Sequence, residues 1–93
     1  MDKIAAHKEL CEKIHEVYIQ KNNAYGDSFG RSFADWGIAS AAVRISDKVN
    51  RFFNLARHPE TDHGDESLTD TLMDLANYAL MTVIELENIK EDN

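Results

Sequence analysis

The chain has 93 residues, of which 43% are apolar and 29% are charged, with one Pro and four Gly. This length fits a single domain over residues 1–93 and allows only a limited core, so we expect self-association. The formal net charge of −7 argues against non-specific nucleic-acid binding, because phosphate contacts need clustered Lys and Arg. A small anionic ligand at a local basic cluster stays compatible with that charge.

The sequence also indicates a compartment. Cys11 is the only cysteine, which excludes an intrachain disulfide and fits a reducing cytoplasm. The first residues, MDKIAAHKEL, are polar from the second residue on and predict no signal peptide. No apolar run approaches the roughly 18–20 residues that cross a bilayer. We therefore expect a cytoplasmic protein without a membrane partner.

The first of three helical patterns covers about residues 2–22, with Asp2 as its N-cap. Its apolar positions recur at helical spacing: Ile4, Cys11, Ile14, Val17 and Tyr18. The break from Asn22 to Gly37 contains three glycines and four aromatic residues, and Ser32–Trp36 is a candidate for a short helical turn.

The second helix is predicted from about Ile38 to Ala56, and the third from Asp65 or Glu66 to Ile89. Between them, RHPETDHGDE reads as a solvated loop. One side of the second helix is apolar and carries Ala41, Ala42, Ile45, Val49, Phe52, Phe53 and Ala56. No segment alternates as a strand does, so the predicted fold class is all-α: three long helices plus the short turn.

A row of polar residues follows the third helix, in the stretch ESLTDTLMDLANY. Glu66, Asp70, Asp74 and Asn77 lie within an arc of about 80°. The opposite side is apolar and carries Leu68, Leu72, Leu75, Ala79, Val83 and Leu86. A solvated face is the simplest interpretation of the row.

Two observations favour a functional interpretation. The row continues as Met81 and Ile84, which makes the second half of the helix apolar nearly all round and predicts burial on both sides, with another subunit as one candidate cover. Carboxylates at i, i+3 and i, i+4 spacing can converge on one divalent cation such as Mg²⁺, which takes oxygen ligands and substrate phosphates.

The second helix supplies basic residues. Arg44, Lys48 and Arg51 share a face with Asp47, at spacings that suit phosphate oxygens. The alternative is salt bridging, within this helix or with the acids of the third helix.

The stretch KNNAYGDSFG, residues 21–30, combines two glycines with polar donors and acceptors. Tyr25 is a candidate for stacking on a nucleobase. For Phe29, Phe33 and Trp36 we favour a role as plugs of a small core. His7, Cys11 and His15 follow one another at i, i+4 spacing, but they offer fewer ligands than a structural zinc site needs.

Three runs together resemble one family: KNNAYGDSF, RISDKVNRFFNL and ESLTDTLMDLANYAL. Over about residues 15–85 they resemble the nucleotide modification associated domain 1 family, whose small members are common in phages and prophages and are similar to the all-α MazG-like nucleotide pyrophosphohydrolases. The resemblance implies a helical bundle completed by oligomerisation, as a dimer or tetramer. It also implies Mg²⁺-dependent (or Mn²⁺-dependent) hydrolysis of a nucleoside triphosphate to the monophosphate and pyrophosphate.

MazG-like proteins hold the metal with an E-x-x-E pair on one helix and an E-x-x-D pair on the next. By this resemblance Glu66, Asp70 and Asp74 stand for the second pair, with altered spacing, as catalytic residues and metal ligands. Asp47 alone stands for the first pair. The residues expected to bind substrate are Lys21, Tyr25, Arg44, Lys48, Arg51 and Asn77. The shortage of acids keeps two alternatives open: a non-catalytic nucleotide-binding or sequestering module, and a structural helical interaction protein.

Overall fold

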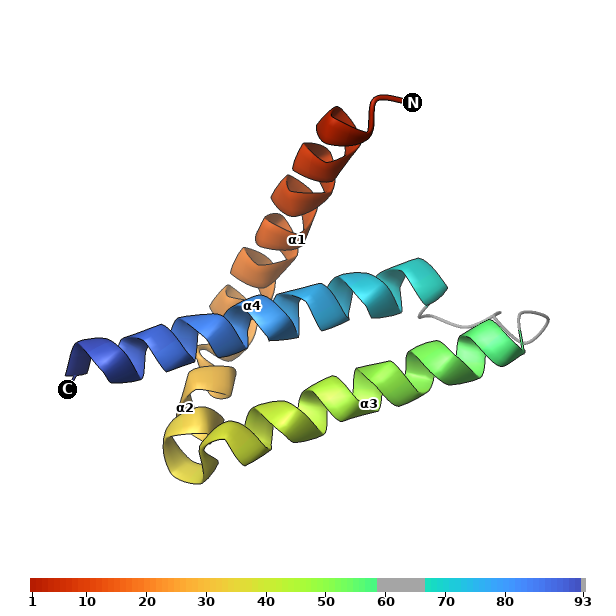
Figure 1. Ribbon diagram of the computed structural model, residues 1–93. Coiled ribbons are helices and arrows are strands. Elements are labelled where there is room, and N and C mark those ends of the chain that lie inside the picture. The colour runs from red at the N-terminus through yellow and green to blue at the C-terminus, as the bar shows by residue number, and fades with distance from the viewer. Residues whose placement is uncertain (59–66, 93) are drawn as a thin grey trace.

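The computed structural model describes residues 1–58 and 67–92. These residues form four helices and no strand (Figure 1), which confirms the all-α fold class. The helices are α1 (Lys3–Tyr25), α2 (Ser28–Trp36), α3 (Ile38–Arg57) and α4 (Leu68–Asp92). The three long helices lie where they were predicted, but α1 and α4 each continue three residues beyond the predicted end. The predicted start of the last helix, at Asp65 or Glu66, lies outside the described residues. The expected turn over Ser32–Trp36 is instead a nine-residue helix that begins four residues earlier.

Local signals explain where the first two helices begin and end. Asp2 caps α1 as predicted, and its carboxylate accepts from the backbone N–H of Ile4 (3.1 Å) and Ala5 (3.2 Å). Gly26, with φ of 68°, ends α1 in a conformation that favours glycine. Asp27 then caps α2 by accepting from Gly30 N–H at 3.0 Å, so the new helix starts within two residues of the old one.

A second glycine with φ of 68°, Gly37, separates α2 from α3. Its N–H donates to the carbonyl of Phe33 at 2.7 Å, which closes α2. Figure 1 shows that α3 then runs beside α4, and that α1 crosses α4 with its N-terminal half projecting beyond the other helices. The end of α1 and the start of α2 therefore lie near the middle of α4.

The core is small and aromatic. Phe29, Phe33 and Ala41 are buried, and Tyr78 and Met81 of α4 pack against them. The Phe29 ring lies 6.1 Å from the Tyr78 ring, centroid to centroid. These contacts confirm the predicted plugging role of two of the three aromatic residues.

The predicted role of Trp36 as a plug of the core is wrong, because Trp36 is 76% exposed. Trp36 is the last residue of α2 and immediately precedes Gly37. The chain turns at this corner, so that Trp36 does not join the cluster that Phe29 and Phe33 form with α4.

The side of α4 that meets the rest of the chain carries two buried threonines, Thr71 and Thr82. Their hydroxyls donate to backbone carbonyls one turn earlier, those of Ser67 (2.9 Å) and Tyr78 (2.7 Å), so each hydroxyl has an acceptor four residues before it in the chain. Leu80, Val83 and Ile84 of α4 stay exposed to solvent, although the sequence predicts burial on both sides of this helix. None of the helices in the described part of the chain has the length and apolar character of a membrane span.

Candidate functional site

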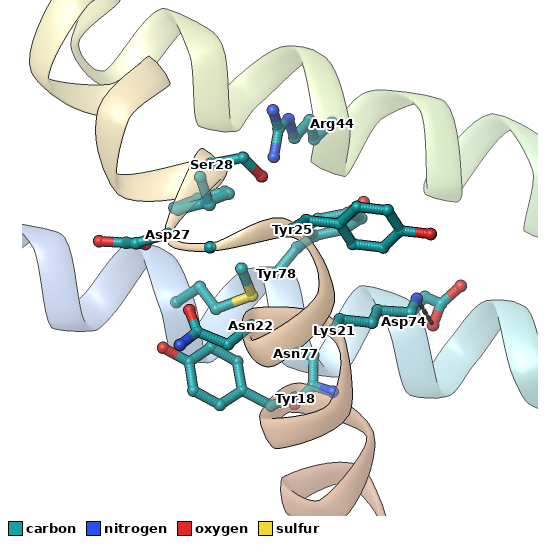
Figure 2. Close-up of a pocket in the computed structure, with 13 residues that line it drawn as sticks. Tyr18, Lys21, Asn22, Tyr25, Asp27, Ser28, Arg44, Asp74, Asn77 and Tyr78 are labelled. Atoms are coloured by element: carbon teal, nitrogen blue, oxygen red, sulfur yellow. Dashed lines mark ion pairs between the residues drawn. The ribbon is translucent and has the colours of Figure 1, made fainter.

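A cavity of about 310 Å³ lies where α1, α2, α3 and α4 approach one another. This volume is at the lower end of the range of small-molecule sites. Figure 2 shows Arg44 and Ser28 on one side of the cavity and the Lys21–Asp74 ion pair on another. The lining is Tyr18, Lys21, Asn22, Tyr25, Gly26, Asp27, Ser28, Phe29, Arg44, Asp74, Asn77, Tyr78 and Met81.

The lining contains two cationic side chains, Lys21 and Arg44, and of these Arg44 has the weaker compensation by negative charge. Its guanidinium lies 5.4 Å from the centroid of the Phe29 ring, and Nη2 donates to Ser32 Oγ at 3.4 Å. Within residues 1–58 and 67–92, no carboxylate pairs with this half-buried group. A cation that is partly desolvated and meets only a hydroxyl and an aromatic ring favours an anionic ligand.

The two lysines of the predicted phosphate site both meet Asp74. Lys48 Nζ lies 3.0 Å from Asp74 Oδ2, and Lys21 Nζ lies 3.6 Å from Asp74 Oδ1. The first pair is the salt bridge between the second and third long helices that the sequence offered as an alternative. Lys21 is 60% exposed whereas Lys48 is 19% exposed, so the Lys21 contact is much the more solvated of the two.

The structure brings together five of the predicted ligand contacts and one of the predicted acids. Lys21, Tyr25, Arg44 and Asn77 line the cavity with Asp74, and Lys48 reaches it through Asp74. Arg51 and Asp47 are exposed on α3 and are not part of the lining. Glu66 lies outside the described residues, so its predicted role as ligand or base stays a prediction.

Asp70 has a local structural role. Its carboxylate accepts from the backbone N–H of Ser67 (3.5 Å), while its own N–H donates to Ser67 Oγ (3.1 Å). This reciprocal pair is a capping box at the start of α4. Asp70 also lines a second cavity of about 360 Å³ between α1 and α4, together with Lys13, Ile14, Val17, Met73, Asp74 and Asn77.

The predicted metal ligands do not converge in the described part of the chain. No group of three His, Cys, Asp or Glu side chains is placed there to hold a metal ion. Asp74 instead faces two ammonium groups and Asp70 serves the capping box. The described members of the predicted ligand set, Asp47, Asp70 and Asp74, do not by themselves supply the several converging oxygen ligands that Mg²⁺ takes, and Glu66 lies outside the described residues.

The other metal candidate is also not assembled. Cys11 Sγ lies 3.7 Å from His7 Nδ1 on the exposed surface of α1. His15 is exposed on the same helix. These three side chains form no metal-binding group among the described residues.

Asn77 links α1 to α4. Its Nδ2 donates to the carbonyl of Ile14 at 2.9 Å, across 63 residues of sequence. The sequence suggested that Asn77 orients a ligand, but this bond gives it a positioning role as well. It holds α1 at the point where the two cavities meet.

Some lining residues were missed by the sequence reasoning. Tyr18, Tyr78 and Met81 line the cavity but were not predicted to contact a ligand. Asn22 and Ser28, which also line it, belong to the stretch of polar donors and acceptors that the sequence singled out. One signal was available: Tyr18, Lys21, Asn22 and Tyr25 follow the i, i+3, i+4, i+7 spacing of one helix face. The predicted break at Asn22 concealed that face, because α1 in fact continues to Tyr25.

Comparison with known proteins gives one family. The sequence model described as nucleotide modification associated domain 1 matches residues 21–86, which is more than two thirds of the chain. No curated protein and no solved structure matches the chain. The matched range contains α2, α3 and every lining residue of the first cavity except Tyr18.

Proposed function

Because the chain belongs to the nucleotide modification associated domain 1 family, we propose that it binds a nucleotide in the cavity between α1, α2, α3 and α4. The observation that carries this proposal is the half-buried Arg44, which lines the cavity and meets no carboxylate of the described residues. A phosphate group supplies the missing negative charge and can accept two parallel N–H bonds from the guanidinium.

The remaining lining suits the rest of a nucleotide. Tyr18, Tyr25 and Tyr78 present aromatic surface to the cavity, on which a base can stack. Asn22 and Ser28 offer short polar side chains for the base edge or the sugar hydroxyls. An apolar, aromatic wall with a few placed polar groups is typical of small-molecule sites.

Lys21 is proposed as a second phosphate contact. Its pair with Asp74 is long and solvated, and such a pair is worth little. Moving Lys21 from Asp74 to a phosphate therefore costs little, whereas Lys48 keeps its 3.0 Å pair with the same carboxylate. Asp74 then holds Lys48 while Lys21 and Arg44 face the ligand.

The test is nucleotide binding measured by calorimetry and thermal shift. Nucleoside mono-, di- and triphosphates are titrated against the wild type, with and without Mg²⁺. We expect Arg44→Gln to weaken binding at least about tenfold, because it removes a charge-assisted contact. Arg57→Gln is the matched control, since Arg57 also stacks over a phenylalanine, Phe53, at 5.6 Å, but lies outside the cavity lining. Absence of binding by every nucleotide, or equal effects of both variants, contradicts the proposal.

A second candidate function is Mg²⁺-dependent hydrolysis of a nucleoside triphosphate to pyrophosphate, as a cytoplasmic protein of phage type. One observation supports it: Asp70 and Asp74 line the same second cavity, which shares Asp74 and Asn77 with the first. Release of pyrophosphate in the presence of Mg²⁺ or Mn²⁺ tests this activity directly. If the protein binds a nucleotide without hydrolysing it, the sequestering module is the function that remains. If it neither binds nor hydrolyses a nucleotide, the structural interaction protein remains.

The proposal includes self-association as a dimer or tetramer. Four apolar side chains are buried among the described residues, namely Phe29, Phe33, Ala41 and Leu55. A core of this size supplies little stability for one small domain. Sedimentation of the wild-type protein tests the oligomeric state.

A further inference from the structure

The outward side of α4 is apolar and uncovered. Leu80, Val83 and Ile84 are 52%, 53% and 54% exposed. The opposite side of the same helix carries Thr71 and Thr82, which are buried. The exposed residues therefore do not belong to the packing surface that α4 shares with α2 and α3.

The spacing of this outward side is that of a helix-pairing surface. Ala76, Leu80 and Val83 follow one another at intervals of four and three residues, which is the repeat of knobs-into-holes packing. Leu72 and Ile84 flank them, so that the apolar surface spans an arc of about 120°. The polar Glu87 and Lys90 end the repeat toward the C-terminus and pair with each other at 3.7 Å.

The solvent-accessible area of the chain indicates how much surface a second copy could bury. The chain exposes 6993 Å², about 1,500 Å² more than the roughly 5,500 Å² expected for a compact monomer of this mass. Its radius of gyration is 14.9 Å, against about 12 Å for a compact domain of this length. If each of two copies buried the excess, their interface would total about 3,000 Å², within the range of obligate homodimers.

The exposed apolar residues of α1 also indicate a missing partner surface. No residue of α1 is buried, although Ile14 and Val17 line the cavity against α4. The same apolar stripe continues toward the N-terminus through Leu10, which is 50% exposed, on the half of α1 that projects beyond the other helices (Figure 1). Apolar surface that continues along a helix beyond the point where it crosses its neighbour is typical of a contact with a further partner.

We infer that the outward side of α4, centred on Leu80 and Val83, is the surface on which two copies of this chain pair. A two-fold interface places the same patch of both copies in contact, so one self-complementary apolar helix face is sufficient. An anionic membrane is a poor occupant, because the chain carries a net charge of −7. The inference rests on the proposed self-association and names its surface, but it does not depend on nucleotide binding.

The test replaces one valine on the surface and one outside it. Val83→Asp places a short carboxylate in the interface twice, once from each copy, and is expected to weaken dimerisation at least about 100-fold. Val43→Asp is the matched control, because Val43 is also helical and is 60% exposed on α3. Sedimentation equilibrium gives the dissociation constants, and circular dichroism reports whether each variant keeps its helices.

A second measurement covers the case in which Val83→Asp fails to fold. In a Cys11→Ser background the chain has no cysteine, so that a single new cysteine reports contacts between copies. We expect Leu80→Cys to give a disulfide-linked dimer under mild oxidation by copper phenanthroline, and Val43→Cys to give little. A monomeric wild type overturns both self-association and its surface. A wild-type dimer that survives Val83→Asp and does not cross-link through Leu80→Cys overturns the surface alone.

Discussion

Lys48 of α3 and Asp74 of α4 form an ion pair of 3.0 Å beside the candidate site. Their side chains are 19% and 24% exposed, so the pair is mostly shielded from water. It joins α3 to α4, which run side by side, and fixes the carboxylate that the sequence suggested as a metal ligand. Asp74 therefore has a structural partner in the chain itself.

The first prediction concerns this pair. Asp74→Asn keeps the shape of the side chain but removes its charge, and we expect it to lower the free energy of unfolding by about 1–3 kcal/mol. Lys21→Ala is the comparison, because the Lys21 contact is 3.6 Å and solvated, and its loss should cost less than about 0.5 kcal/mol. Urea unfolding of the three proteins measures both values. If both variants lose the same free energy of unfolding, the greater burial of Lys48 does not make its ion pair stronger than that of Lys21.

The second prediction concerns stacking at the cavity. Tyr25 is 70% exposed and lines the cavity, so Tyr25→Ala should leave stability almost unchanged while weakening nucleotide binding roughly 5- to 150-fold, the range of one stacked base. Trp36→Ala is the control, since Trp36 is similarly exposed but lies outside the lining. Calorimetric titration with the nucleotide that binds best measures the ratio. An intact affinity in Tyr25→Ala would remove Tyr25 from the site.

The fold was largely predictable because its helices carry local signals. Apolar periodicity places the long helices, and Asp2 and Gly37 mark a start and a boundary that the structure confirms. The sequence did not predict the full length of α2, because Asp27 lies between Gly26 and Gly30 and resembles an ordinary loop residue. Its capping bond to Gly30 becomes evident only once the backbone geometry is known.

The site was less predictable, since helical periodicity gives the face of a helix but not the helix that this face meets. Lys48 and Asp74 are 26 residues apart, and nothing local to either residue selects that partner over the solvated alternatives. Asn77 likewise reads as a polar residue of the acidic row, yet it bonds to a carbonyl of α1. The spacing of Asp70 assigns it to the acidic row, but in the structure it forms a capping box with Ser67.

The third prediction tests that capping box. Ser67→Ala removes the hydroxyl that accepts from Asp70 N–H, and we expect a loss of about 1 kcal/mol in the free energy of unfolding. Thr69→Ala is the control, because Thr69 is exposed in the same turn and no capping bond involves it. Chemical denaturation measures both. If Ser67→Ala matches the wild type, the box contributes nothing and the role of Asp70 lies in the second cavity.

The fourth prediction concerns Gly30, which lies inside α2 with ordinary helical geometry. Replacing such a glycine by alanine normally stabilises a helix by about 0.5–1 kcal/mol. Here an added Cβ would lie 2.7 Å from Cγ of Asp27, so the side chain that caps α2 must move away. We therefore expect Gly30→Ala to destabilise the protein by up to about 1 kcal/mol, because the lost cap, worth about 0.5–2 kcal/mol, outweighs the gain in helix propensity.

A double-mutant cycle with Asp27→Ala separates the two effects. Without the Asp27 carboxylate there is nothing for the new methyl group to displace, and Gly30→Ala should then stabilise the protein relative to Asp27→Ala alone. The sign of the Gly30→Ala effect thus reverses between the two backgrounds, which a purely additive pair cannot do. Urea unfolding of the four proteins measures the cycle. A Gly30→Ala change that raises stability equally in both backgrounds would show that the Asp27 cap tolerates the methyl group.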